Sequence, residues 1–127
     1  MLKFFNYMIL LFILSGCAIK QPKQSSSATI LIKTPTMKFY DKGFITEYEN
    51  YTQVQIFSAG ALVLNLDLYK NRICKSSFEC KSLKEFNKEN LDISYDEKFL
   101  LELFNKKDKK VVFRDKKIGV LIKIIRD

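Results

Sequence analysis

Residues 53–69 read QVQIFSAGALVLNLDLY, and this stretch carries the pattern from which the fold can be predicted. Polar and apolar side chains alternate on both sides of a break at Ser58–Gly60. Alternation with a period of two is typical of a half-buried β-strand, and a glycine in a short break favours a tight turn. The stretch therefore predicts a β-hairpin, and its apolar face would carry Val54, Ile56, Ser58, Leu62, Leu64, Leu66 and Leu68.

Further hairpins are predicted towards the C-terminus. Lys70–Asn71 offers a second tight turn, which leads into a strand at residues 72–74. Near the end of the chain, apolar residues 111–113 and 120–126 flank the turn-forming stretch 115–119, so that they predict a final hairpin.

Two more strands are predicted near the start of the domain. Residues 30–32 and 37–40 are rich in apolar and aromatic side chains, and Pro35 between them favours a bend or a sheet edge. Asp41–Gly43 predicts a turn that would redirect the chain towards Phe44.

Two stretches change to helical spacing. Ser82 with Glu85 and Ser94 with Glu97 match the capping box, in which the side chains of both residues bind free backbone amides at a helix start. Apolar residues then recur at helical spacing, namely Leu83, Phe86 and Leu91 in the first case and Leu100, Leu103 and Phe104 in the second. We therefore expect an α+β fold, a mainly antiparallel β-sheet of hairpins with two short helices inserted before the C-terminal hairpin.

The N-terminus has the layout of an export signal. Lys3 gives a positive start, and the apolar stretch 4–14 is interrupted only by Asn6. A membrane-spanning helix needs about 20 apolar residues, and this stretch is much shorter. Residues 1–16 are therefore predicted to be a signal peptide.

The end of that stretch, Leu14-Ser15-Gly16-Cys17, resembles the lipobox of bacterial lipoproteins. The resemblance implies that Leu14, Ser15 and Gly16 are read by the signal peptidase, that the Cys17 thiol takes a diacylglyceryl group, and that cleavage occurs before it. A fatty acid such as palmitate usually follows on the new amine, and two or three acyl chains hold a protein firmly to a membrane. The alternative is a simple secretory signal with Cys17 as an ordinary thiol.

The same resemblance implies a location. In known lipoproteins, Asp after the acylated cysteine favours retention at the inner membrane, and this chain has Ala18 there. We therefore expect a lipoprotein of a Gram-negative bacterium, anchored in the outer membrane and facing the periplasm. Beyond the lipobox, the chain is similar to small lipoproteins of such bacteria only in general features, such as the Cys74 and Cys80 pair and the charged turn of the C-terminal hairpin. It shares no functional motif with them, so the resemblance implies no activity.

The remainder divides into a tether and one domain. Residues 17–29 contain the lipidated cysteine and the polar stretch Gln21–Ser27, which has little to bury and predicts a flexible tether with a reach of ~20 Å. Residues 30–127 are short enough for a single small α+β domain.

Cys74 and Cys80 remain once Cys17 is assigned to lipid, and five residues separate them. In an oxidising periplasm such a pair is most simply a disulfide, here expected to join the end of a strand to the start of the first helix. Redox exchange is disfavoured because the two-residue spacing of thioredoxin-like sites is absent. A metal site is disfavoured because the chain has no histidine to complete it.

The lack of histidine also argues against an enzyme, since it removes the most frequent general base. Carboxylate pairs remain possible at Glu47 with Glu49 and at Asp92 with Asp96 and Glu97, but charged turns and helix starts explain them. We therefore expect no catalytic residues, no metal and no cofactor apart from the lipid on Cys17.

The formal net charge of +8 could attract nucleic acid or an anionic surface. Arginine, the better reader of phosphates and bases, is scarce, and an exported protein rarely meets DNA. The basic run Lys106–Lys110 predicts a solvated turn, which Lys116–Lys117 would join as a patch if the last two strands pair. No nucleic-acid partner is expected, whereas weak contact with anionic lipid or cell-wall polymer is possible.

Two non-enzymatic functions remain. The first is an interaction or assembly module of the cell envelope that presents a sheet edge or aromatic side chains to a protein partner, since aromatics cluster at Tyr40, Phe44, Tyr48 and Tyr51, although some of these could face the core. The alternative is a carrier that binds lipid or lipoprotein in a groove between the sheet and the helices. The short length favours the module.

Overall fold

The computed structural model describes residues 21–76 and 78–127, which form eight strands and two helices. The helices are α2 (Leu83–Asn90) and α3 (Phe99–Asn105), and both lie between β6 and the last two strands. The predicted α+β class is confirmed. The strands are β1 (Gln24–Lys33), β2 (Lys38–Glu47), β3 (Tyr51–Ser58), β4 (Ala61–Tyr69), β5 (Arg72–Lys75), β6 (Glu79–Ser82), β7 (Lys110–Asp115) and β8 (Val120–Arg126).

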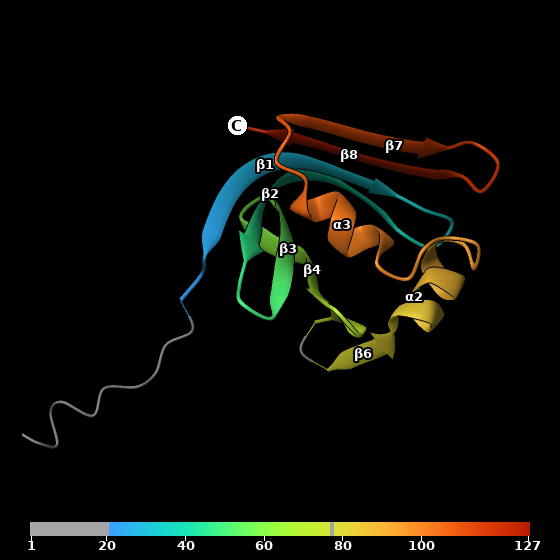
Figure 1. Cartoon of the computed structure of the whole chain (residues 1–127). Helices are drawn as coiled ribbons and strands as arrows, with labels where there is room; N and C mark the ends of the chain where they lie inside the picture. Colours follow the sequence, from blue (N-terminus) through green and yellow to red (C-terminus); the bar gives the residue numbers. More distant parts are fainter. Residues whose placement is uncertain (1–20, 77) are drawn as a thin grey trace, which may run out of the picture.

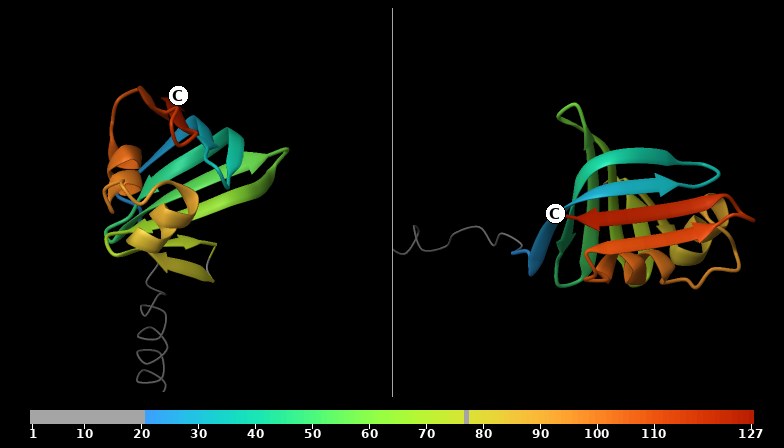
Figure 2. Two further views of the ribbon diagram at one scale, coloured as in Figure 1. Left: turned by 90° about the vertical axis from the view of Figure 1, so that its right-hand side faces the viewer. Right: turned by 90° about the horizontal axis from the view of Figure 1, so that it is seen from above.

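All eight strands form one antiparallel sheet in the order β6-β5-β4-β3-β2-β1-β8-β7. Strands β1 to β6 follow one another as a meander, and the final hairpin returns to lie beside β1. The sheet curls around α2 and α3, so that both helices lie on its inner face (Figures 1 and 2).

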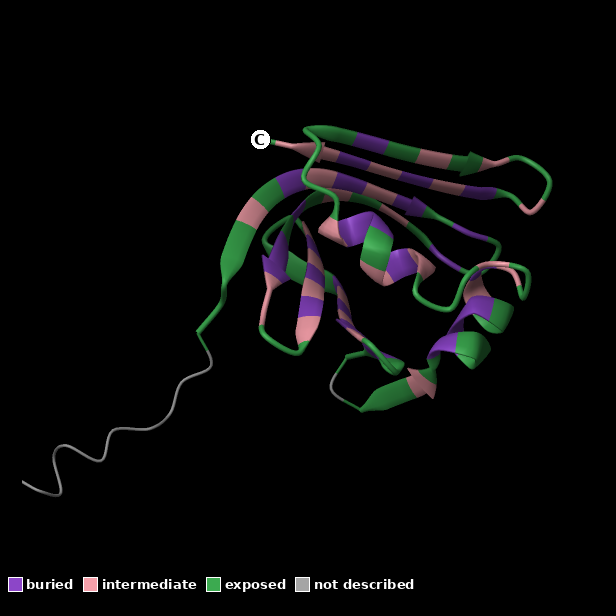
Figure 3. Cartoon of the chain, viewed as in Figure 1, coloured by how far each residue is buried: buried purple, intermediate pink, exposed green. Residues whose placement is uncertain are grey.

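The core fills the space between the inner face and the helices. Alternate residues of the central strands point into it, as the banding along each strand in Figure 3 shows. The helices contribute Leu83 and Phe86 from α2 and Leu100, Leu103 and Phe104 from α3, each at most 5 % exposed. Both sets of helical apolar residues predicted from spacing therefore face the sheet, because each helix is stable only when its apolar stripe is covered.

Gly43 lets β2 approach β3 closely within the sheet. It was predicted to be part of a turn, but β2 runs unbroken through it from Lys38 to Glu47. A Cβ atom at Gly43 would lie 2.1 Å from the backbone oxygen of Gln55 on β3, closer than any real contact. Glycine in a strand often marks such a close approach of two backbones. The predicted turn was wrong because this glycine permits a close approach of two paired strands instead.

The β3–β4 hairpin is present, with an irregularity near its tip. Ala59 and Gly60 have φ values of 50° and 80°, which is the pattern of a type I′ turn. The register then shifts between Ile56 and Phe57, leaving Val63 as an extra residue in β4. This bulge turns Leu62 to the outer face, where it is 49 % exposed, so its predicted place with Leu64 on the apolar face was wrong.

The two predicted helix starts had different outcomes. Ser82 caps α2 by accepting a hydrogen bond of 3.2 Å from the Glu85 amide, as predicted. Ser94 caps nothing, because its hydroxyl and amide both bind Asp92, and α3 begins only at Phe99. The local turn around Asp92 competes successfully with the capping box for this serine.

The sheet begins earlier than predicted. The amide of Lys23 already donates to the backbone oxygen of Glu47 at 2.8 Å, and β1 pairs with β2 from Gln24 onwards. Residues 24–29, predicted to be part of the tether, therefore belong to the first strand. Ser25 explains how such a polar stretch is held, since its hydroxyl lies 3.1 Å from the Thr46 hydroxyl on β2.

Candidate functional site

The predicted lipobox, Leu14, Ser15 and Gly16 with Cys17, lies outside the described residues. The chain enters the described part at Gln21 and joins the sheet beside the end of β2. The end of the sheet at which it enters is the first candidate site.

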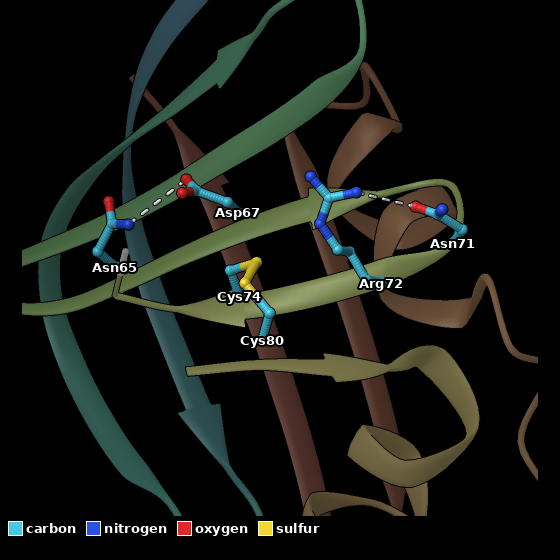
Figure 4. Close-up of a disulfide and its surroundings, with 6 residues drawn as sticks. All are labelled: Asn65, Asp67, Asn71, Arg72, Cys74 and Cys80. Atoms are coloured by element: carbon cyan, nitrogen blue, oxygen red, sulfur yellow. Dashed lines mark hydrogen bonds between the residues drawn. A yellow bond between two sulfur atoms is a disulfide. The ribbon is translucent and has the colours of Figure 1, made fainter. Parts of the chain in front are cut away.

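The predicted disulfide between Cys74 and Cys80 is present (Figure 4). Its place differs from the prediction, because Cys80 lies in a strand and not at a helix start, so that the bond joins β5 to β6. Cys74 is 4 % exposed, and both strands have only four residues. A bond across so short a hairpin compensates for the small apolar surface that the hairpin buries.

Three tyrosines stack in a column at the end of the sheet where the N-terminal chain enters. The ring centroids of Tyr48 and Tyr51 are 4.7 Å apart, and those of Tyr51 and Tyr69 are 4.8 Å apart. The guanidinium carbon of Arg72 lies 3.9 Å from the centroid of the Tyr69 ring, a cation–π contact. Together with Lys70, these residues are here called the tether-side rim.

Strand register brings the rim together. Tyr51 is paired with Tyr69 across β3 and β4, while Arg72 follows the β4–β5 turn and donates a long hydrogen bond of 3.5 Å to Asn71. The sequence prediction included Tyr48 and Tyr51 but missed Tyr69 and Arg72, because it grouped aromatics by nearness along the chain. The partner positions of the predicted hairpin were the signal that could have found Tyr69.

Two depressions adjoin the rim. One, of about 110 Å³, is lined by Gln21, Tyr48, Glu49, Asn50 and Tyr51. The second is wider and open, about 600 Å³, and is lined by Asn50, Tyr51, Tyr69, Lys70, Asn71 and Arg72. The N-terminal chain thus leaves the domain beside the tyrosine column.

The rim favours the neutral form of Tyr51. Burial, and then the neighbouring Tyr48, Asp67 and Tyr69, raise the pKa of Tyr51 above its usual value of 10.0. A neutral phenol has an apolar ring and a polar hydroxyl, so it suits surfaces that are partly apolar and partly wet.

The other predicted aromatics lie elsewhere. Phe44 packs edge-on against Phe57, with centroids 5.8 Å apart, and Phe57 is paired with Leu62 across the β3–β4 hairpin. Phe44 and Leu62 are 45 % and 49 % exposed. We call Phe44, Phe57 and Leu62, together with the exposed Val63 beside them, the outer patch.

Tyr40 is still more open, at 68 % exposed, near the start of β2. The predicted cluster of four aromatics therefore divides between the rim, the outer patch and this isolated position.

The basic run does not form the predicted patch. Lys106–Lys110 is exposed as expected, and Lys107 pairs with Glu47 at the tether end of the sheet. Lys116–Lys117 lies in the β7–β8 turn, at the opposite end of a hairpin in which Lys110 is paired with Ile125 and Asp115 with Val120. The hairpin forms, but its length separates the two groups of lysines.

Three of the carboxylates considered for catalysis have structural contacts. Glu47 binds Lys107, Asp92 binds Ser94, and Asp96 accepts a hydrogen bond of 2.8 Å from the Lys98 amide. The Ser94 hydroxyl and amide lower the pKa of Asp92. No group of three or more potential metal ligands occurs among residues 21–76 and 78–127.

The inner face, where a carrier would need its groove, is filled by helix side chains such as Leu100 and Phe104, at 2 % and 0 % exposed. Within the described part of the chain, no helix has the length and apolar character needed to cross a membrane.

No family model, curated protein or solved structure matches this chain.

Proposed function

We propose that this chain is a bacterial lipoprotein, anchored through Cys17 in the outer membrane, whose domain is a non-enzymatic interaction module of the cell envelope. The lipobox resemblance supports the anchor. The outer patch supports the module, and it is the observation that carries this proposal.

The outer patch has the properties of a protein-binding surface. Exposed apolar side chains gathered in one place mark interaction sites on soluble domains more often than scattered ones do. Phe44 contacts Phe57, and Phe57 is paired with Leu62, so the three side chains are held together across β2, β3 and β4. An aromatic anchor that is already positioned loses little conformational freedom when a partner covers it.

A capture experiment tests the module. The full chain and two variants, Phe44→Ser with Leu62→Ser and the control Ile93→Ser, are incubated with detergent-solubilised envelope proteins. Ile93 is 60 % exposed between the helices, so the control removes a comparable apolar side chain away from the patch.

We expect one envelope protein to be recovered by the wild type and by Ile93→Ser at micromolar concentration, and lost with the double variant. Recovery of no partner, or equal recovery by all three chains, would refute the module. Metabolic labelling with palmitate tests the anchor separately, since Cys17→Ser should abolish incorporation.

A further inference from the structure

We infer that the tether-side rim rests on the anionic headgroups of the membrane that holds the lipid on Cys17; this inference builds on the proposed anchor. The outer patch would then face away from the lipid and remain open to a protein.

The chain between anchor and domain is too short for the domain to leave the membrane. Because Lys23 is already bonded to Glu47, six residues at most separate the acylated cysteine from the sheet. Such a segment spans ~21 Å when fully extended and has a root-mean-square length of ~14 Å. The headgroup layer alone is about 5–8 Å thick, so the domain remains next to the surface.

The point of attachment determines which side faces the lipid. Gln21 lines the same depression as Tyr48 and Tyr51, so the chain leaves the domain at the rim itself. Tyr40 lies near the other end of β2, seven residues from Glu47, which corresponds to ~23 Å along the strand. The rim can reach the headgroups while Tyr40 remains clear of them.

The chemistry of the rim suits this position. Tyrosine is enriched where membranes meet water, because its ring is apolar and its hydroxyl is polar. Lys70 is exposed in the β4–β5 turn, and Arg72 is held over Tyr69, so both can meet lipid phosphates.

Carboxylates at this end do not cancel these cations. Glu47 is already paired with Lys107, so two carboxylates, Glu49 in the β2–β3 turn and Asp67, which raises the pKa of Tyr51, remain for three cations. These cations are Lys23, Lys70 and Arg72.

The chain contains no tryptophan, which makes a direct test possible. Tyr48→Trp places one fluorescent probe at the rim, and Tyr40→Trp places the matched control at the other end of the same strand. Each full chain, expressed with its signal and purified from membranes, is reconstituted into vesicles of phosphatidylethanolamine and phosphatidylglycerol with brominated lipid near the headgroups. Asn50→Trp, in the same turn, replaces the first probe if Tyr48→Trp does not fold.

We expect quenching of the Tyr48→Trp variant to be at least twofold stronger than that of Tyr40→Trp, with emission shifted to the blue. Replacing phosphatidylglycerol by phosphatidylcholine should reduce the difference, and equal quenching in both lipids would refute recognition of anionic headgroups. An acylated Tyr48→Trp chain that is quenched no more than Tyr40→Trp overturns the inference, because its rim then faces protein, glycan or solvent, while the anchor stands. A chain found by intact mass to lack acyl groups refutes the anchor, and the inference with it.

Discussion

Strand β2 connects two aromatic regions that are held in different ways. Beyond its C-terminal end, Tyr48 stacks on Tyr51 in the tyrosine column. Near its N-terminal end, Tyr40 is 68 % exposed, and Phe44 further along meets one ring at an edge. Exposure of aromatics alone therefore does not define a binding surface. The tyrosines of the rim are held by ring stacking, whereas the Tyr40 side chain is mostly exposed to solvent.

Gly43→Ala should have the largest effect on stability. Gly43 lies in β2, the strand that connects the two aromatic regions. A Cβ atom 2.1 Å from the Gln55 oxygen would force β2 away from β3, and we expect a loss of about 3 kcal/mol or more in the free energy of unfolding. Gly60→Ala is the control, since nothing lies within 4 Å of its Cβ position and only its φ of +80° opposes alanine. It should lose about 1 kcal/mol. Equal losses in urea denaturation would contradict the role given to Gly43.

Removing the disulfide with Cys74→Ala and Cys80→Ala should destabilise only β5 and β6, the edge of the sheet that carries Arg72 of the rim. The loop that it closes is short, so we expect a loss of about 2 kcal/mol. Hydrogen exchange should show β5 and β6 losing protection first, with Arg72 at the start of β5, while β2 and β3 keep theirs. Protection lost evenly over the sheet would show that the bond stabilises the whole domain instead.

A matched pair of variants compares the aromatics directly. Tyr69→Ser removes a ring that stacks on Tyr51 and lies under Arg72, so it should lose about 1–2 kcal/mol. Tyr40→Ser should change stability by less than about 0.5 kcal/mol, as exposed positions usually do. Thermal unfolding of both variants is sufficient for this test. Similar losses would mean that the stacking in the column contributes little.

Tyr95→Phe tests a contact at the end of the sheet away from the tether. Its effect on stability should depend on pH. The Tyr95 hydroxyl donates to Asp115 at 2.6 Å, which lowers the pKa of Asp115 below 3.8, while burial and this bond raise the pKa of Tyr95 above 10.0. The stabilisation is therefore present between these values, lost as pH falls and Asp115 protonates, and lost as pH rises and Tyr95 ionises. The stability difference from wild type should be constant from about pH 5 to 9 and shrink on both sides. If the stability difference did not vary with pH, the hydrogen bond from Tyr95 to the ionised Asp115 could not be its source.

Ala59→Asn should give the smallest effect, a gain of about 0.5 kcal/mol. Ala59 has a φ of 50° in the β3–β4 turn, where alanine is strained and asparagine before glycine is preferred. Urea denaturation should show the gain without any change in the rim. A loss of stability would mean that the turn is not of type I′.

The hairpins and helices were predictable where local pattern and packing agree. The β3–β4 stretch alternates cleanly, and Ser82 begins α2 as its side chain requires. The bulge that exposes Leu62 and the close approach at Gly43 depend on the geometry between strands, which a single segment does not encode.

The candidate sites follow the same division. The Cys74–Cys80 pair was predictable from cysteine usage, but its place in the sheet was not, because β6 is too short to give a pattern. The rim needed the pairing of Tyr51 with Tyr69, and the early start of β1 at polar Gln24 needed β2 as its partner.

The most direct test of the anchored domain is the mass of the N-terminal peptide from the chain purified out of bacterial membranes. We predict a peptide that begins at Cys17 and carries a diacylglyceryl group, with Cys17→Ser leaving the signal uncleaved and the lipid absent. A peptide that begins elsewhere, with Cys17 unmodified or removed, would contradict the anchor and the arrangement of the rim on the membrane.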